Sequence, residues 1–511
     1  MAFLPTTSPR RAGRREWAAL GVLMLAVVLL AIDATVLYMA VPALTADLAP
    51  SATQLLWIGD IYSFALAGLL ITMGNVADRV GRKRLLVIGC GAFGLASVMG
   101  AFAFSPEMLI AARALLGVAG ATIMPSTLSI VRAMFEDPKQ RARAIAAWAA
   151  GATGGAALGP LVGGALLERF WWGSVFLINV PIMVIVVVAG IMLLPESRNP
   201  QAALVDLPSA VLSIVSIVTI VYAVKHVVGT GLDWSVPVAA AVGVAAAVLF
   251  VMRQRRLPLP LVDIRLFRLP AFSGAVGASA LSIFAFSGVL FFFSQYLQLV
   301  RGYSPLLAGL AELPMTLASI VVIMFIGALV TKLGAGRAIS LAFVTAAVGL
   351  AGLSLTEGLP TYWGVGLSLT VLGLAVGVAM TLSTDAVVSV APRDRAGAAA
   401  SISETAYELG VALGIAVLGS LQTAFYRANL ALPATVDAKE RLVTHNSLAS
   451  ASSQFRASGR TDLLEHAQHA FTVGMQVTSG IAAALMLVAA VVAWRVIPSE
   501  RTGKVVAHEG H

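Results

Sequence analysis

Several carboxylates interrupt long apolar stretches of this sequence, where a charged side chain is energetically costly. Four acids each lie inside an apolar run long enough to cross a bilayer: Asp33, Asp60, Glu404 and Glu408. A charged side chain at the middle of a membrane helix costs about 2.5–3.5 kcal/mol on insertion scales. Such residues usually face a bundle interior or a wet cavity and mark a path for ions or substrates. One such acid could be a structural hydrogen-bonding group, whereas four together favour a cavity that handles protons or cations.

The spacing of two of these acids predicts how they would work. Glu404 and Glu408 are four residues apart, so they share one face of a helix. Two carboxylates close together in a dry site do not easily ionise together, and the pair is expected to hold a proton when no cation is bound. A bound cation would then expel protons, and protons arriving from outside would expel the cation. This competition is antiport.

The elements that carry the acids are predicted to be membrane helices. The chain has 511 residues, of which 59% are hydrophobic and only 12% are charged. A soluble protein carries about 25% charged residues, so we expect an all-α integral membrane protein. Fourteen segments have close to the ~20 residues that a spanning helix needs. They lie near residues 17–40, 54–74, 85–104, 107–131, 143–167, 172–194, 207–228, 236–252, 271–299, 304–330, 338–356, 361–389, 397–422 and 470–495.

The net charge of +9 is explained by membrane topology and does not require a nucleic-acid partner. With a cytoplasmic N-terminus, 25 of the 34 Lys and Arg residues fall in predicted cytoplasmic segments. The positive-inside rule therefore predicts that both termini are cytoplasmic. The single cysteine, Cys90, excludes an intramolecular disulfide. The sequence lacks a G-x(4)-G-K-(S/T) loop, so we expect a proton gradient as the energy source, with no cofactor and no metal site.

An internal repeat predicts two related halves. Loops 74–84 and 327–337 share a glycine, a polar residue and a cation four and five positions on, and a second glycine two positions later. Each loop follows an even-numbered span, which suggests two six-helix halves with spans seven and eight inserted between them. Paired halves of this kind place a transporter's substrate site at their interface. The predicted organisation is a cytoplasmic N-terminus (1–16), an N-terminal half (17–196), an inserted pair (197–256), a C-terminal half (257–495) with an outer loop (423–469), and a cytoplasmic tail (496–511).

Three motifs resemble those of the major facilitator superfamily. Loop 74–84 is similar to the signature G-x-x-x-D-R-x-G-R-(K/R), and its matching residues are Gly74, Asp78, Arg79, Gly81 and Arg82. The fifth segment is similar to the antiporter motif C, G-x(7)-G-P-x-x-G-G, with matches at Gly151, Gly159, Pro160, Gly163 and Gly164. Arg113 resembles the motif B arginine, which is thought to tune a nearby proton-carrying acid. Small residues four apart also permit close helix packing.

The resemblance narrows to the QacA-type fourteen-span drug:proton antiporters, which include the SmvA and LfrA pumps. It rests on residues 56–63, 123–129, 176–181 and 403–410, and it extends from Trp17 through the last span. Acids of spans 1, 2 and 13 carry protons and meet cationic drugs in that family, and they fall on the four acids above. The resemblance implies a monomeric secondary transporter of a bacterial cytoplasmic membrane. Its substrates would be small lipophilic cations, such as quaternary ammonium drugs, antiseptics and dyes, exchanged for protons across the lipid bilayer.

The chain departs from the family in span ten. QacA-like pumps that handle divalent cations carry an acid five residues after the proline of an A-G-L-x-x-L-P stretch, and Ser319 takes that place here. Glu312 offers a carboxylate about two turns closer to the outer surface. Glu312 is expected either to substitute for the family's acid or to belong to a different exit route.

Aromatic residues near the acids are candidates for the lining of the substrate site. A lipophilic cation that leaves water gains roughly 0.5–2 kcal/mol from each aromatic face. The candidates are Trp57, Tyr62, Trp148 and Tyr407, although most aromatic residues of membrane helices pack against lipid or neighbours. In the outer loop, residues 438–457 and 460–469 are predicted to form short surface helices. A solvated connector is favoured there over a lid.

Other function classes fit less well. Export of an endogenous lipid, antibiotic or metabolite on the same fold is the second interpretation, because a fold does not dictate its ligand. A membrane enzyme is disfavoured, since the sequence shows no nucleophile–base pair or metal cluster. A passive channel would not need two related halves with antiporter motifs.

Overall fold

The computed structural model describes residues 11–198, 206–229, 231–257, 260, 262–390, 396–433 and 436–497. Within these residues the secondary structure is helical throughout, and fourteen helices are long and apolar enough to cross a membrane. Each of the fourteen predicted segments falls on one of them. The predicted tails, 1–16 and 496–511, lie for the most part outside the described residues.

The N-terminal half contains five long helices and a broken sixth span. They are α1 (Arg14–Leu48), α2 (Ala52–Val80), α3 (Arg82–Ala101), α4 (Pro106–Met134), α5 (Pro138–Leu167), α6 (Ser174–Leu177) and α7 (Asn179–Leu193). Several of these helices begin where the sequence supplies a cap. Ser105 accepts a hydrogen bond from the Met108 amide, and Asp137 accepts one from the Gln140 amide. In both cases a proline follows at the first helical position, where a missing N–H costs nothing.

The remaining spans form the inserted pair and the C-terminal half. The inserted helices are α8 (Leu207–Gly229) and α9 (Ser235–Arg256), followed by the short η1 (Ile264–Arg268). The C-terminal half contains α10 (Pro270–Gln295) with η2 (Tyr296–Val300), α11 (Pro305–Ile323), α12 (Ile326–Leu333), α13 (Ala335–Thr356), α14 (Trp363–Val390), α15 (Ala396–Asn429) and α18 (Thr461–Val496). Between α15 and α18 lie α16 (Ala438–Asn446) and α17 (Leu448–Ser458).

The backbone supports the internal repeat. Gly81 and Gly334 hold matching positions in the two loops, and both have positive φ angles, of 121° and 80°. Each glycine separates two helices, and residues with side chains rarely adopt this part of φ/ψ space. In the first loop Asp78 accepts a hydrogen bond of 2.8 Å from Nε of Arg82, and Arg79 is exposed. The two loops therefore share backbone geometry as well as residue spacing.

Two parts of the chain differ from the sequence-based expectation. The predicted span 304–330 ends at Ile323 and continues as the separate helix α12. In the outer loop, 438–457 breaks at Ser447, which caps α17, and 460–469 is the first part of α18. The loop is also more than a solvated connector, because α17 packs against α1 and α18 and buries Leu448 and Phe455. These two residues are seven apart, so they lie on one face of the helix.

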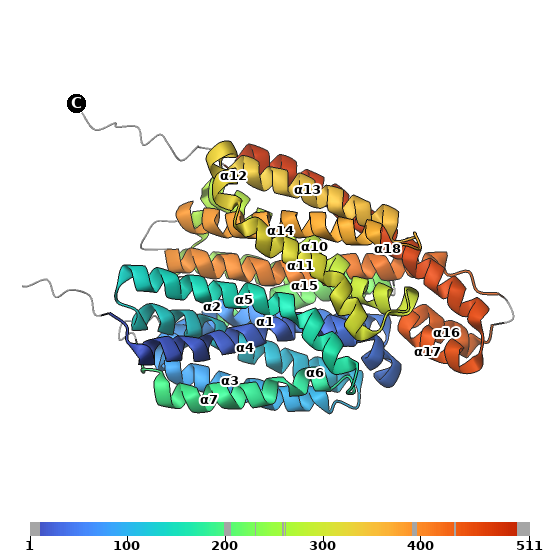
Figure 1. Cartoon of the computed structure of the whole chain (residues 1–511), viewed down its shortest axis with the longest axis horizontal. Coiled ribbons are helices and arrows are strands. Elements are labelled where there is room, and N and C mark those ends of the chain that lie inside the picture. Colours follow the sequence, from blue (N-terminus) through green and yellow to red (C-terminus); the bar gives the residue numbers. More distant parts are fainter. Residues whose placement is uncertain are drawn as a thin grey trace, which may run out of the picture.

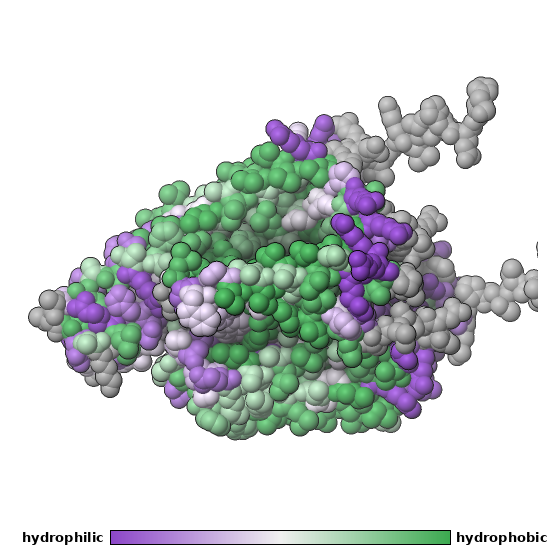
Figure 2. Space-filling model, turned by 180° about the vertical axis from the view of Figure 1, so that it is seen from behind, coloured by the Kyte–Doolittle hydropathy of each residue, from purple (hydrophilic) through white to green (hydrophobic). Residues whose placement is uncertain are grey.

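The two halves lie side by side, as Figure 1 shows, with α16 and α17 at one end of the bundle. We call this the cap end, and the opposite end, which carries Gly81 and Gly334, the basic end. The halves contact each other through α1 and α10, α2 and α15, and α5 and α11. The face seen in Figure 2 is apolar over most of its middle, and hydrophilic side chains gather towards the two ends. This distribution is typical of a protein that spans a bilayer.

Candidate functional site

The N-terminal half buries Asp33 in a hydrogen-bonded cluster. Its Oδ2 accepts from Nη1 of Arg113 (3.1 Å), on α4, and its Oδ1 accepts from Nδ2 of Asn179 (2.7 Å), on α7. Arg113 also donates from Nε to the carbonyl oxygen of Ile58 on α2 (3.3 Å), and Asn179 also contacts Ser97 on α3 (3.1 Å). The structure therefore places Arg113 directly against Asp33. Both carboxylate oxygens are satisfied, and five helices of this half meet at the cluster.

Asp60 on α2 has a partner that the sequence reasoning missed. Nζ of Lys225, on the inserted helix α8, lies 2.9 and 2.7 Å from its two carboxylate oxygens. The same ammonium lies 4.0 Å from the ring centroid of Trp57, one turn before Asp60 on α2. The carboxylate and the ammonium side chains are almost fully buried. Trp57 and Asp60, both predicted substrate-binding residues, thus hold a cationic side chain of the protein itself.

Glu404 and Glu408 lie on α15, where it meets α2. Glu408 is buried and accepts a hydrogen bond from the hydroxyl of Ser63, three residues after Asp60 on α2. Glu404 is close enough for its charge to act on Glu408, and it is partly exposed. Tyr407 lies between the two acids in sequence and interacts electrostatically with both. Glu408 therefore contacts the N-terminal half through α2, the helix that carries Asp60.

Two tyrosines connect these clusters. The guanidinium of Arg113 lies over the ring of Tyr62, 4.6 Å from its centroid, and Tyr62 interacts electrostatically with both Asp33 and Glu408. Tyr38, five residues after Asp33 on α1, is in electrostatic range of Asp60, Glu312 and Glu408. Tyr38 was not among the predicted site residues. Tyr38 is five residues from Asp33 and so lies on a different face of α1, and helical spacing alone gave no signal for it.

Glu312 lies on α11 and is almost completely buried, at 2% exposure. Its Oε1 has no hydrogen-bond partner among the described residues. The hydroxyl of Ser319, at the position of the family's acid, donates to the carbonyl oxygen of Thr316 in its own helix (2.8 Å). The structure thus places an unsatisfied carboxylate in span ten, on a different turn from the family's acid.

The glycines of α5 join the helix of Asp33 to the helix of Glu312. A Cβ added at Gly163 would lie 2.8 Å from Cγ2 of Val36 on α1, and one at Gly159 would overlap Thr35. On the other side, a Cβ at Gly164 would lie 2.5 Å from the carbonyl oxygen of Pro305 at the start of α11. Gly151 also faces α1, where an added Cβ would lie 3.4 Å from Val28, and the carbonyl of Pro160 lies against Gly309 of α11. These glycines are therefore close-packing positions, and α5 contacts both halves.

The remaining predicted residues lie nearer the basic end. Nε1 of Trp148 donates to the hydroxyl of Thr127 on α4 (3.2 Å), and Trp148 is partly buried. A Cβ at Gly74 would be in ordinary contact with Pro125 of α4, at 3.7 Å. Trp148 and Gly74 thus join neighbouring helices of the N-terminal half, and their part in transport stays a prediction.

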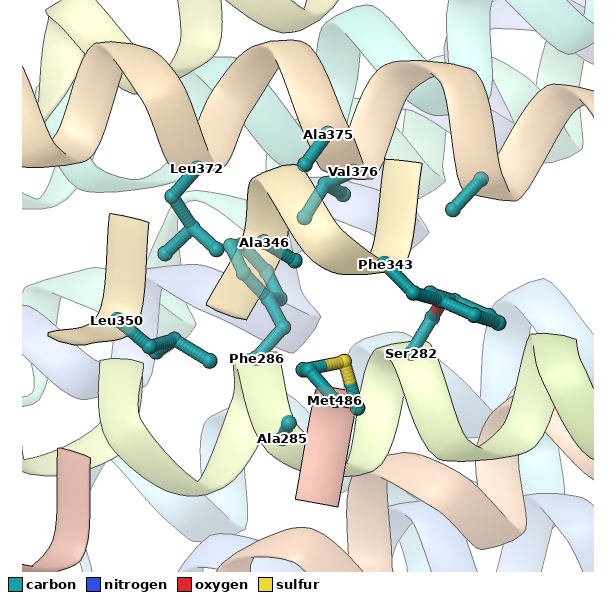
Figure 3. A pocket seen from close by; sticks show the side chains of 11 residues that line it. Ser282, Ala285, Phe286, Phe343, Ala346, Leu350, Leu372, Ala375, Val376 and Met486 are labelled. Atoms are coloured by element: carbon teal, nitrogen blue, oxygen red, sulfur yellow. The ribbon is translucent and has the colours of Figure 1, made fainter. Parts of the chain in front are cut away.

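A small apolar cavity lies elsewhere, within the C-terminal half. Figure 3 shows that it is enclosed by side chains of α10, α13, α14 and α18, including Ser282, Phe286, Phe343 and Met486. No carboxylate belongs to its lining. The acids lie on α1, α2, α11 and α15, and none of these helices contributes to the lining, so this cavity is separate from the candidate site.

Comparisons with known proteins agree with this architecture. Residues 23–415 match the family model of the Major Facilitator Superfamily. The chain is 45% identical to the multidrug efflux pump LfrA of Mycolicibacterium smegmatis, with 95% of this chain and 97% of LfrA covered. It is 36% identical to the methyl viologen resistance protein SmvA of Salmonella typhimurium, with 94% and 98% covered. Among solved structures, a bacterial homologue of the lysosomal transporter Spinster, in an inward-facing and unoccupied conformation, superposes with a TM-score of 0.66 at 18% identity, with 96% and 99% covered.

Proposed function

The chain belongs to the major facilitator superfamily, and we propose that it exports lipophilic cations from the cell in exchange for protons. The observation that carries this proposal is the balance of buried charge. Five carboxylates lie on spans that contact the opposite half: Asp33, Asp60, Glu312, Glu404 and Glu408. The described residues give only two of them a cation, Arg113 and Lys225.

The excess of carboxylates creates a demand for positive charge. An ionised carboxylate without a partner in a low-dielectric interior costs several kcal/mol, so it takes up a proton or a cation. A site of this kind binds protons and lipophilic cations in competition. Because the acids come from both halves, a movement of one half against the other changes which side of the membrane they face.

The acids are expected to have different roles in transport. Asp33 is bonded by Arg113 and Asn179 on both oxygens, so protonation there would release contacts among α1, α4 and α7. We assign it to proton coupling. Glu404 and Glu408 have no ion-pair partner among the described residues and lie beside Tyr407, so we assign them to the substrate as well as to protons. Aromatic faces next to free carboxylates are the groups that a lipophilic cation needs.

The orientation follows from the charge distribution. Lys and Arg side chains of the loops gather at the basic end, and by the positive-inside rule this end faces the cytoplasm. The cap end then faces the outside. The named contacts between the halves, such as those of Gly164 and Gly309, lie towards the cap end. On this assignment the two halves are in contact at the outer end of the bundle.

The test is a measurement of protons released on binding. Purified protein is mixed with ethidium, a monovalent lipophilic cation, in weakly buffered solution, and binding and proton release are recorded together. We expect release in the parent protein and less release in Glu404→Gln and Glu408→Gln. Asp33→Asn is expected to keep some binding but to lose transport driven by a pH gradient in inverted vesicles.

Two outcomes would count against the proposal, and a third would count against the role of Asp33. Binding of ethidium without proton release, in the parent protein and all variants, would exclude a competitive antiport site. Binding of neutral lipids or metabolites in preference to every cation would favour export of an endogenous compound instead. Normal concentrative uptake by Asp33→Asn vesicles would remove Asp33 from coupling.

A further inference from the structure

Lys225 is an unusual lysine for its place in the chain. It lies four residues before the end of α8, where a long cationic side chain ordinarily extends to the membrane surface and keeps its charge in water. Its side chain is instead turned inward and is 1% exposed. The next residue, His226, lies closer to the surface and pairs with Asp233 at 2.7 Å. Lys225 therefore forms a buried ion pair, although its place near the helix end would let its ammonium reach water.

The helix that carries Lys225 covers the seam between the halves. α8 packs against α2 of the N-terminal half and α15 of the C-terminal half. Close to the middle of α2, a Cβ at Gly68 would lie 2.7 Å from Cγ1 of Ile214. Further along α8, Val221 is buried in a cluster with Phe64 of α2 and Ala412 of α15. The inserted helix thus contacts the surfaces that must move apart when the halves rotate. The side chain of Lys225 extends from this helix towards Asp60, where α2 meets α15.

The ammonium of Lys225 sits between the two kinds of group that a lipophilic cation requires. A carboxylate supplies both of its oxygens, at 2.9 and 2.7 Å, and the Trp57 ring supplies an aromatic face at 4.0 Å. A carboxylate and an indole face together stabilise a desolvated cation much better than either does alone. The ammonium thus has both kinds of group beside it without any substrate.

We propose that Lys225 is a built-in cation that occupies the Asp60–Trp57 subsite and must be displaced by a substrate cation. This inference rests on the proposed function, because it gives Asp60 a substrate role. A substrate binds at this subsite only if it displaces the ammonium that already occupies it. Lys225 is therefore a specificity-determining residue. Neutral and anionic molecules offer no positive charge to replace the ammonium, and weakly bound cations are rejected. The displaced ammonium has only one turn of α8 to pass before it reaches the surface.

The first experiment measures affinity in full-length protein in lipid nanodiscs. Ethidium binding is compared in the parent and in Lys225→Met, in alkaline buffer so that a proton does not replace the lysine on Asp60. Removal of a competing interaction of about 1–3 kcal/mol should tighten binding roughly 5–150-fold. Lys225→Arg keeps the competing charge and should bind like the parent. Lys139→Met, at an exposed lysine at the start of α5, is the matched control and should also bind like the parent.

A double variant shows whether the effect passes through Asp60. Lys225→Met with Asp60→Asn removes both charges, leaves no buried charge unpaired, and should lose the gain in affinity. Unchanged or weaker ethidium binding in a folded Lys225→Met protein would overturn the proposal. Equal gains in Lys225→Met and in the double variant would also overturn it.

The second experiment needs no variant, so it stands even if Lys225→Met fails to fold. The parent protein is treated with an amine-acetylating reagent with and without saturating ethidium, and each lysine is quantified by mass spectrometry. Displacement predicts that ethidium raises acetylation of Lys225 and leaves Lys139 unchanged. If ethidium binds and releases protons while Lys225 stays equally protected, the displacement is wrong and the proposed function stands. If ethidium neither binds nor releases protons, the proposed function itself fails.

Discussion

The glycine contacts of α5 allow a prediction about the transport cycle. At Gly164 an added Cβ would lie 2.5 Å from the carbonyl oxygen of Pro305 and 2.9 Å from Cα of Leu306. Both are backbone atoms of the opposite half, so a side chain cannot simply rotate away. Gly164→Ala therefore forces α5 and α11 apart near the cap end. Overpacking of this kind costs about 1–3 kcal/mol.

The cost of Gly164→Ala applies only while the halves touch at the cap end. A state that opens there escapes the clash, so the equilibrium should shift towards it by roughly 5–150-fold. Gly154→Ala is the matched control, because it lies in the same helix and an added Cβ would meet nothing within 4 Å. The ordinary gain of an alanine over a glycine in a helix is common to both variants and cancels.

Cysteine cross-linking measures the shift. The amide of Leu306 lies 3.4 Å from Oε2 of Glu168, so Glu168→Cys with Leu306→Cys reports closure at the cap end. The sole native cysteine, Cys90, is buried and is replaced by alanine in this background. We expect the disulfide yield to fall in Gly164→Ala and to stay at the parent level in Gly154→Ala. Equal yields in the two variants would refute the view that this contact closes the cap end.

Three further predictions test other contacts. Arg113→Met leaves Asp33 buried without its cation and should destabilise the protein by about 3–5 kcal/mol. Adding Asp33→Asn should restore much of the lost stability. Equal thermal unfolding temperatures of the single and double variants would contradict this prediction. Glu312→Gln should weaken export of divalent cations more than export of monovalent cations, and Ser319→Asp should strengthen divalent export. If the ratio of divalent to monovalent export is unchanged in both variants at matched expression, Glu312 has no role in substrate binding. Gly81→Ala places a side chain at φ 121° and should cost about 1–3 kcal/mol, visible as a lower unfolding temperature; a stability equal to that of the parent would show that the loop relaxes.

The membrane explains why so much of the fold could be predicted. A span must be apolar over its own length, so each of the fourteen helices is readable from a local stretch of sequence. The repeat was readable for a similar reason, since Gly81 and Gly334 hold positions whose backbone requires glycine. The break in span ten was not readable, because residues 324 and 325 are an ordinary apolar pair. The buried face of α17 could have been found from the spacing of Leu448 and Phe455.

The partners of the acids were harder to predict than the acids. An acid in an apolar run stands out by itself, whereas Lys225 and Asp60 are 165 residues apart in the chain. A lysine near a helix end also has a simple alternative explanation at the membrane surface. Asn179 lies in a stretch that carried the family resemblance, but no sequence pattern identifies its partner. Its contact with Asp33 needs α1 and α7 to pack together, which no local pattern specifies.

The charge pairs differ between the two halves in a way that constrains the mechanism. Asp33 and Asp60, in the N-terminal half, each bind a cation of the protein, while Glu312, Glu404 and Glu408, in the C-terminal half, bind none among the described residues. Loss of an acid in the first half leaves a buried cation without its ion-pair partner, and loss of one in the second half leaves no buried cation unpaired. The C-terminal acids should therefore tolerate neutralisation structurally and change mainly what is bound.

The cation of Asp60 comes from the inserted pair and from neither half. Without α8, Asp60 would have no ion-pair partner among the described residues, and its demand for positive charge would rise. The inserted helices thus set how many of the seam's carboxylates are free for protons and substrate. Since α8 also packs on both α2 and α15, a change in the occupancy of Asp60 acts on the surfaces where the halves meet. Binding and movement are in this way linked through one side chain, Lys225.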